Sequence, residues 1–407
     1  MAIRRPLKNV RNGPVPGGIA HKKEPPMATQ RKRIGVVIPK YGTVGGAEGF
    51  VAELTERLAL NPDWEIHVFA NQWVRRSDNV TFHRVSVIPF PRFFVTPSFA
   101  LYAAKEMESQ GIDLIHTHDR IFAADLFTMH GTPHSYWVYG VREKPFMSLF
   151  DRATAWVERK LVTGGRCSRF FAVSELTRKL YIEEYGLDPG MVEVHHPGVD
   201  LGMYEGLDRE ECRREVRQHL QIGIKEPVIL FVSMNFEVKG LDRIMAGLSE
   251  IKLRRPTEPF RLLVVGRGNE RKYRGIAQRL GIDDRVLFTG PVPREELAKV
   301  YLASDVYAML SMFDTFGMVV LEAMAAGLPV AVSGTVGARD IVVPGENGYV
   351  IEDPQRPAEV ATILSALLNP RERERMGEAA RRTATEHTWE KAAGRVEEHY
   401  RRLLYPR

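Results

Sequence analysis

Short apolar runs alternate with amphipathic stretches along most of the chain, from Arg33 onward. The apolar runs are continuous, which is typical of parallel strands that are buried on both faces. In the first half, strands are predicted at Ile34–Ile38, Glu65–Phe69, Val80–Val87, Leu114–Thr117, Leu126–Met129 and Arg169–Val173. Helices are predicted between them at Ala47–Leu60, Phe99–Gln110, Ser148–Val162 and Ser174–Tyr185. This alternation predicts a doubly wound α/β domain.

The same rhythm starts again after a pause at Pro197–Gly206, where proline and glycine gather. Further strands are predicted at Val228–Val232, Arg261–Val265, Val286–Phe288, Val306–Met309 and Val330–Val332. Further helices are predicted at Leu241–Leu253, Arg271–Leu280, Glu295–Ala303 and Val319–Ala326. Two successive units of this kind predict an α/β fold class, with two Rossmann-like doubly wound domains that face a cleft.

The pattern divides the chain into four segments. They are a basic tail, a first Rossmann-like domain, a second Rossmann-like domain and a C-terminal helix, predicted at residues 1–32, 33–203, 204–386 and 387–407. The stretch Ala358–Leu404 has a helical pattern with a break at Trp389. We expect the helix after this break to cross back and pack on the first domain.

Composition is that of a globular protein, because 44% of the 407 residues are hydrophobic and 27% are charged. No run approaches the roughly 18 to 20 apolar residues that a membrane span needs. The longest candidate, Phe316–Val332, contains Glu322 and Pro329. The two cysteines, Cys167 and Cys212, cannot build a disulfide framework and lack metal-ligand spacing. A reducing, cytoplasmic compartment is therefore expected.

The net charge of +6 belongs to the amino-terminal tail. Residues 1–33 hold nine Lys and Arg against one Glu, which leaves a net charge of −2 for the rest of the chain. A nearly neutral body argues against nucleic acid as a partner. The tail is rich in Pro and Gly, which predicts disorder. The alternative is a basic arm that contacts anionic lipid.

A glycine-rich turn, residues 42–48 (GTVGGAE), leads from the first predicted strand into the first helix. Gly45 and Gly46 have no Cβ, so a ligand can approach the backbone closely, and the helix start offers unpaired N–H groups. The spacing differs from the dinucleotide fingerprint G-x-G-x-x-G. A purely structural turn is the alternative, because every strand-to-helix connection needs one.

A second connection of this kind, residues 231–240 (FVSMNFEVKG), carries Lys239 next to the start of a predicted helix. A lysine there adds a full positive charge beside the backbone N–H groups, and the two together suit a diphosphate. The alternative is a solvated surface lysine, which is common.

The most specific motif is residues 314–327 (DTFGMVVLEAMAAG), in which Asp314 lies in a loop and Glu322 about two turns into a helix. A carboxylate among the apolar neighbours of Glu322 needs a partner, and sugar hydroxyls are suitable donors. The Phe-Gly-Met segment supplies N–H groups at the helix start, where a phosphate can bind. The alternative, a glutamate that simply points to water, fits this apolar helix less well.

Together, these motifs resemble the retaining glycosyltransferases of family 4 (group 1), which have the GT-B fold. Their signature is two acidic residues separated by seven positions, and Asp314 stands here for the usual first glutamate. The Gly-Gly turn and the strand followed by Lys239-Gly240 also match, whereas Met234 occupies a position where the family often has arginine. The resemblance covers nearly all of Arg33–Leu404.

Shorter segments are similar to the branch that glucosylates the inner core of lipopolysaccharide. They are residues 151–154, 223–226, 235–236, 264–267 and 271–273. The resemblance implies transfer of a glucose-like hexose from a nucleotide-diphosphate sugar, UDP-linked, with retained anomeric configuration. The implied acceptor is a lipid-linked or lipopolysaccharide-core saccharide. We accordingly expect a cytoplasmic enzyme in peripheral contact with the anionic inner membrane.

The candidate site residues fall into three groups. The catalytic candidates are Asp314, His130, Lys239 and Glu322. The donor-binding candidates are Lys239, Lys272, Asp314, Phe316, Gly317, Met318, Val319 and Glu322. The acceptor-side candidates are Gly45, Gly46, Asp125 and His130. His130 is included because the resemblance implies a histidine beside the transferred sugar, and Asp125 is an alternative acid on that side.

No metal or other cofactor is expected. The sequence has no Asp-x-Asp at a predicted strand end and no His/Glu cluster with ligand spacing. The charge on the leaving diphosphate would then be met by Lys239, backbone N–H groups and helix dipoles, assisted by Lys272. The leaving phosphate oxygen can accept the acceptor's proton on one face of the sugar, so the carboxylate pair of a glycosidase is not required.

The role of one aromatic segment and the activity of the protein both stay open at this point. The aromatic segment Val85–Tyr102 contains three prolines and either packs against its own sheet or rests on a membrane with a lipid-linked acceptor. The architecture also suits a nucleotide-sugar epimerase, which needs no acceptor. A non-catalytic scaffold that binds a nucleotide sugar is the third possibility.

Overall fold

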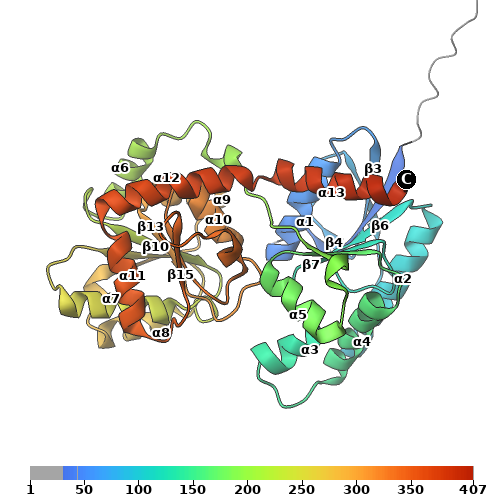
Figure 1. Cartoon of the computed structure of the whole chain (residues 1–407), viewed down its shortest axis with the longest axis horizontal. Helices are drawn as coiled ribbons and strands as arrows, with labels where there is room; N and C mark the ends of the chain where they lie inside the picture. Colours follow the sequence, from blue (N-terminus) through green and yellow to red (C-terminus); the bar gives the residue numbers. More distant parts are fainter. Residues whose placement is uncertain (1–30, 44, 407) are drawn as a thin grey trace, which may run out of the picture.

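The computed structural model describes residues 31–43 and 45–406. The tail predicted at residues 1–32 lies outside the described residues except for its last two, and Lys32 already opens the first strand. Two α/β domains lie side by side, and the last two helices of the chain lie one along each domain, α12 (Pro370–Glu386) along the second and α13 (Trp389–Leu404) along the first (Figure 1). The predicted fold class is confirmed.

The first domain is built on a seven-stranded parallel sheet in the order β5-β3-β1-β6-β7-β8-β9. The strands are β1 (Lys32–Val37), β3 (Trp64–Ala70), β5 (Val80–Arg84), β6 (Leu114–Thr117), β7 (Leu126–Met129), β8 (Arg169–Ala172) and β9 (Val192–Val194). Helices cover the sheet: α1 (Gly46–Leu58), α2 (Val95–Ser109), α4 (Leu149–Thr163) and α5 (Glu175–Tyr185). A small pair, β2 (Lys40–Tyr41) with β4 (Gln72–Trp73), and a short α3 (His134–Tyr136) complete the domain.

The second domain has a six-stranded parallel sheet in the order β12-β11-β10-β13-β14-β15. The strands are β10 (Val228–Ser233), β11 (Arg261–Gly266), β12 (Val286–Gly290), β13 (Val306–Met309), β14 (Val330–Ser333) and β15 (Gly348–Ile351). The helices are α6 (Arg209–His219), α7 (Leu241–Arg254), α8 (Glu270–Arg279), α9 (Arg294–Ala303), α10 (Met318–Ala325), α11 (Pro357–Leu367) and α12 (Pro370–Glu386). The central strands β10, β11, β13 and β14 are almost wholly buried, as their continuous apolar runs predict.

Several elements escaped the sequence pattern, among them the short β2, β4 and α3. Strands β9 and β15 are short and half-buried in part, so their apolar runs are brief. Helix α6 is strongly charged and buries only Cys212 and Arg217. Helix α2 begins at Val95 rather than Phe99, because Pro97 is tolerated in a first helical turn.

Strand order reverses between β1 and β6 in the first sheet, and between β10 and β13 in the second. Ligands of open α/β sheets bind beyond the carboxyl ends of the strands at such a reversal. The loops after β1 and β10 lead into the two strand-to-helix motifs found in the sequence. The fold therefore brings these motifs to the region between the domains.

The C-terminal helix α13 (Trp389–Leu404) packs on α1 of the first domain. Arg57 Nε donates to Glu390 Oε1 at 2.7 Å, and Asn61 Nδ2 donates to Glu397 Oε2 at 2.9 Å. Where the chain crosses back, Val199 N donates to the carbonyl of His387 at 2.8 Å. The chain thus passes between the domains twice, at neighbouring points.

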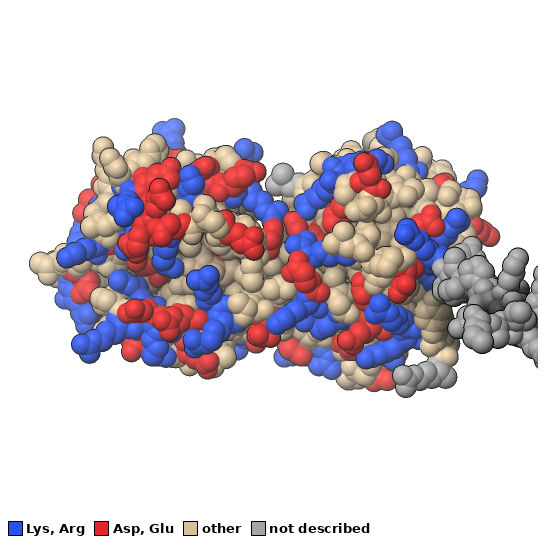
Figure 2. Space-filling view, turned by 90° about the horizontal axis from the view of Figure 1, so that it is seen from above, with Lys and Arg blue, Asp and Glu red and all other residues tan. Residues whose placement is uncertain are grey.

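Acidic and basic side chains are intermixed over the face of both domains seen in Figure 2. Among the described residues, no helix is both long and apolar enough to cross a membrane. The aromatic segment Val85–Tyr102 is divided: Val85 and Phe99 are buried, whereas Phe90 is 81% exposed. Neither of the two interpretations of this segment therefore accounts for all of it.

Candidate active site

A cavity of about 410 Å³ lies between the two domains, and both contribute to its wall. The first domain and the connection after it contribute Gly46, Ala47, Phe50, His130, Val173 and Pro197. The second domain contributes Val232, Ser233, Met234, Lys239, Asp314, Thr315, Phe316, Gly317, Met318 and Val319. Most of the predicted donor-side residues therefore meet at one place.

Lys239 and Asp314 form an ion pair at the second domain's side of the cavity, with Lys239 Nζ donating to Asp314 Oδ2. They come from the loops after β10 and β13, the neighbouring strands at the reversal. Gly240 follows with φ 74°, and a Cβ there would lie 2.0 Å from the carbonyl oxygen of Leu310. Only glycine fits here, so the backbone itself brings Lys239 against the β13 loop.

The start of α10 faces the cavity beside this pair. Gly317, the N-cap residue, has φ 90°, and Met318 and Val319 follow it in the cavity wall. The first N–H groups of a helix have no partner within the helix and carry a partial positive charge. This end of the cavity therefore combines a lysine with the positive end of a helix, which suits a diphosphate.

Glu322 lies one turn further along α10 and is half-buried outside the immediate cavity wall. Tyr301 Oη donates to its Oε2 at 2.9 Å. Burial raises the pKa of the Glu322 carboxyl, and the hydrogen bond from Tyr301 opposes this rise only in part. The predicted partner of this carboxylate is thus provided, within the protein, by a tyrosine that the sequence pattern did not single out.

His130 follows β7 and lies in the cavity wall on the first domain's side. Its ring packs edge-on against Phe50 at 4.6 Å, and its Nε2 is 2.9 Å from His118 Nδ1. Burial lowers the pKa of His130 to about 3. The imidazole is therefore neutral at physiological pH and can exchange hydrogen bonds with a sugar, but it is not a cationic acid.

Besides Glu322, three predicted residues lie outside the cavity wall. Gly45 is the N-cap residue of α1, directly before the wall residue Gly46. Lys272 lies on α8, exposed, with its Nζ 3.3 Å from Glu237 Oε1. Asp125 precedes β7, at the end of the sheet opposite His130, and its Oδ2 accepts a hydrogen bond from Ile115 N at 2.8 Å. Asp125 is therefore a structural anchor, and its predicted role on the acceptor side is wrong.

Further contacts join the two domains directly. Ser174 Oγ donates to the carbonyl of Thr315 at 2.6 Å, and Glu175 N donates to Asp340 Oδ2 at 2.7 Å. Arg294 of the second domain lies 3.2 Å from Glu53 of the first. These residues carry no recognisable motif; only their positions beside strand ends and helix starts could have indicated them.

Two family models match the chain in succession. Residues 44–202 match the model described as Glycosyltransferase Family 4, and residues 213–383 match the model described as Glycosyl transferases group 1. The chain belongs to these glycosyltransferase families. The boundary between the two matches falls at the pause between the two α/β domains of this glycosyltransferase.

Individual relatives of this glycosyltransferase are similar over different lengths. D-inositol 3-phosphate glycosyltransferase from Corynebacterium efficiens is 34% identical over 228 residues, which are 54% of this chain and 53% of that protein. The chain spans about half the length of the curated relatives that it matches. The solved structure of WaaG, a glycosyltransferase involved in lipopolysaccharide biosynthesis, has a TM-score of 0.75 at 20% identity and covers 90% of this chain and 99% of its own.

HepE from Anabaena in complex with UDP-glucose has a TM-score of 0.67 at 17% identity, and covers 90% of this chain and 99% of its own. Likeness at such identities shows the shared GT-B fold alone. The predicted family is confirmed. The predicted lipopolysaccharide-core branch stays a prediction, because WaaG shares the fold at only 20% identity and curated relatives at 34% and 36% identity carry the name D-inositol 3-phosphate glycosyltransferase.

Proposed function

We propose that this glycosyltransferase moves a glucose-like hexose from a UDP-linked donor to a saccharide acceptor, with retained anomeric configuration. The observation that carries the proposal is the juxtaposition of Lys239, Asp314 and the start of α10 on one side of a cavity between two domains. A cation and helix N–H groups suit the donor diphosphate, and a carboxylate beside them suits sugar hydroxyls.

Each residue has a distinct part in this proposal. Lys239 and the N–H groups of Met318 and Val319 stabilise the charge that grows on the leaving diphosphate. Asp314 accepts hydrogen bonds from the sugar, and Glu322 accepts them from the ribose. Neutral His130, across the cavity, contacts the sugar from the first domain's side.

Retention requires no carboxylate pair around the reacting bond if the leaving phosphate oxygen takes the acceptor's proton. Among the described residues in the cavity wall, Asp314 is the one acid, and it is held by Lys239. A glycosidase-type pair therefore has no counterpart among these residues. Proton NMR of a single-turnover product decides the matter: the proposal expects the anomer of the donor, and the opposite anomer would refute it.

Donor binding is expected to be independent of metal. UDP-glucose at 100 times its Kd should stabilise the protein by about 2.7 kcal/mol, with and without EDTA. Thermal unfolding with UDP-glucose, UDP-galactose, GDP-mannose and UDP alone measures the donor preference. A stabilisation that appears only after Mg²⁺ is added would contradict the metal-free assignment.

The acceptor is proposed to be lipid-linked, because one surface of the first domain is apolar. Large apolar side chains are exposed on α2, on α4 and on the loops that precede these two helices. They are Phe90, Phe94, Leu101, Tyr102, Phe146, Leu149 and Trp156. Helix α4 packs against both α2 and the turn at residues 92–94, so these segments adjoin. Exposed Lys144 and Arg152 accompany them. A protein surface that combines apolar and basic groups favours binding to an anionic membrane. On this basis we propose a cytoplasmic location, peripheral on the inner membrane.

Vesicle binding tests this surface directly. The double variant Phe90→Ser/Phe146→Ser removes two side chains that are 81% and 82% exposed, and should reduce co-sedimentation with anionic vesicles about tenfold or more. Leu253→Ser is the matched control, because Leu253 is 72% exposed on the second domain. Equal loss in both variants, or no loss in either, would contradict a specific docking surface.

A second candidate acceptor is an inositol phosphate, because the curated relatives carry that name. The described wall residues of the first domain, from Gly46 to Val173, include no lysine or arginine to hold a phosphate. Turnover with a lipid-linked saccharide against D-inositol 3-phosphate distinguishes the two acceptors. The same assay separates the remaining alternatives, since an epimerase converts the donor without acceptor and a scaffold binds it without turnover.

A further inference from the structure

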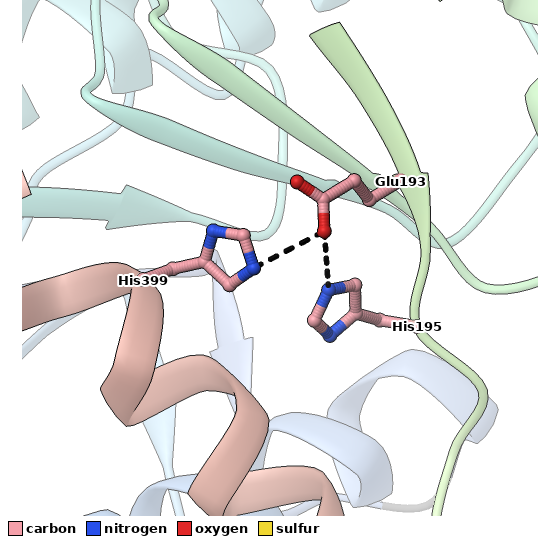
Figure 3. A group of neighbouring side chains, drawn as sticks. All are labelled: Glu193, His195 and His399. Carbon is pink, nitrogen blue, oxygen red and sulfur yellow. Dashed lines mark ion pairs between the residues drawn. The ribbon is translucent and has the colours of Figure 1, made fainter. Parts of the chain in front are cut away.

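A group of three metal-ligating side chains lies outside the transfer site, where α13 rests on the first domain's sheet (Figure 3). Glu193 comes from β9, His195 from the residue just beyond that strand, and His399 from α13. The chain positions are too far apart to form a motif, which is why the sequence pattern predicted no such cluster. None of the three lies in the wall of the cavity.

The two imidazoles converge on one carboxylate oxygen. Glu193 Oε2 is 3.2 Å from His399 Nε2 and 3.7 Å from His195 Nε2. One ligand atom of each residue lies within 4.8 Å of the others. Zn²⁺ with bonds of about 2.0–2.1 Å places tetrahedral ligand atoms about 3.3–3.4 Å apart, so small side-chain rotations bring these three atoms to the required spacing.

The ring of His195 is buried and lacks good hydrogen-bond partners among the described residues. Its side chain is 6% exposed, and its Nδ1 is buried without a hydrogen-bond partner among the described residues. Its Nε2 is too far from Glu193 for a hydrogen bond. Stacking on Phe171, with ring centres 3.6 Å apart, holds the ring in this orientation. The Nε2 atom is thus held facing the Glu193 carboxylate without a hydrogen bond to it, and an ion between the two would be its partner, whereas Nδ1 points away from the cluster.

Both histidines are suited to ligate a metal at neutral pH. Burial lowers the pKa of His195 to about 3, and burial also lowers the pKa of His399, although Glu193 opposes that shift. Neutral imidazoles offer the lone pairs that a metal needs. The Glu193 side chain is 44% exposed, so the cluster has one open side where water can complete the coordination.

The ligand set, and not the surrounding charge, selects among metals. Arg169, Arg395 and Arg402 act on the two histidines and oppose any cation, and Glu398 counters them. Mg²⁺ and Ca²⁺ prefer oxygen ligands, of which this cluster offers one carboxylate. Two imidazoles and one carboxylate are instead the ligand set of Zn²⁺.

We propose that Glu193, His195 and His399 bind one Zn²⁺ that fastens helix α13 to the first domain, with water as the fourth ligand. The role is structural: the metal would join the edge strand β9 to the last helix, next to the buried contact of His116 with Tyr400 of the same helix at 2.7 Å. The proposal is independent of the transfer reaction, because the ion touches no residue of the cavity.

Metal binding to the full chain tests the proposal. After treatment with chelator and its removal, equilibrium dialysis should show one saturable Zn²⁺ per chain. Co²⁺ at the same site should give the visible absorption of a four-coordinate complex, a signal that does not depend on activity. Glu193→Gln and His399→Gln should each weaken Zn²⁺ binding at least tenfold and abolish the cobalt absorption. His219→Gln, which changes an exposed histidine on α6, is the control and should bind as the unchanged protein does.

Three results would overturn the proposal. They are absence of saturable binding, equal binding by all three variants, and Co²⁺ absorption that survives in Glu193→Gln. Because the Glu193 side chain is 44% exposed, Glu193→Gln is expected to fold normally. The test therefore remains decisive even if His399→Gln does not fold. If the ion pair between Glu193 and a protonated His399 were the real function, acidification alone would stabilise the α13 contact and Zn²⁺ would not.

Discussion

Replacing Lys239 with alanine is expected to lower kcat/KM about 100- to 1,000-fold, because it removes the cation that meets charge on the leaving diphosphate. The loss corresponds to about 2.7–4 kcal/mol of transition-state stabilisation, the range found when one preorganised donor is deleted from an active site. The charge develops as the bond breaks, so kcat should fall more than the affinity for the donor. Initial rates over a range of UDP-sugar concentrations measure both.

Lys272→Ala is the matched control for this variant. Lys272 is a lysine of the same domain, at the start of the neighbouring α8, but its Nζ faces Glu237 on the surface rather than the cavity. Its removal should change kcat/KM less than about twofold. Similar losses in both variants would show that general positive charge, and not the Lys239 position, supports the reaction. Circular dichroism confirms that both variants fold.

Glu322→Gln is expected to raise the KM for the donor about 10- to 100-fold with little change in kcat. A hydrogen bond to a charged group contributes about 1.5–3 kcal/mol, and a ribose contact is made equally in the ground state and the transition state. Uniform binding of that kind changes KM alone. Donor titrations at saturating acceptor measure the effect, and Glu295→Gln, an exposed change on α9, serves as the control.

The thermal stability of Glu322→Gln distinguishes a loss of donor binding from a folding defect. Burial raises the folded-state pKa of Glu322, so its contribution to stability is complete below the unfolded-state pKa and is lost as the pH rises through the folded-state value. The ionised form of the side chain is therefore a cost to the fold. Glu322→Gln should unfold at no lower temperature than the unchanged protein at pH 7. A clear decrease would mean that the hydrogen bond from Tyr301 outweighs desolvation.

Much of the fold and half of the site followed from the sequence because their signals are local. Continuous apolar strands are visible without any tertiary information, and the motif from Asp314 to Glu322 combines a loop, a helix start and an acid in nine residues. The strand reversals then determine that the loops bearing Lys239 and Asp314 are neighbours. Local pattern and topology together were sufficient to predict that these residues lie at one site.

The residues that were misplaced depend on tertiary geometry. Asp125 lies only five positions before His130, but a four-residue strand between them puts the two at opposite ends of the sheet. Lys272 lies in the first turn of a helix, but an acid on the surface binds it. The hydrogen bond to Glu322 also went unpredicted, because its donor Tyr301 lies 21 positions earlier and on another helix. Long-range pairs of this kind leave no periodic trace in a sequence.

The two chain crossings between the domains lie beside each other, joined by the hydrogen bond from Val199 N to His387 O. A pair of adjacent covalent connections acts as a hinge with a single axis, unlike one flexible linker, which permits twisting in every direction. Opening for donor entry is therefore expected to swing about Val199 and His387, and to separate Ser174 from Thr315 and Glu53 from Arg294. Shortening the chain before Trp389 would remove one half of that hinge and free the domains to rotate out of register.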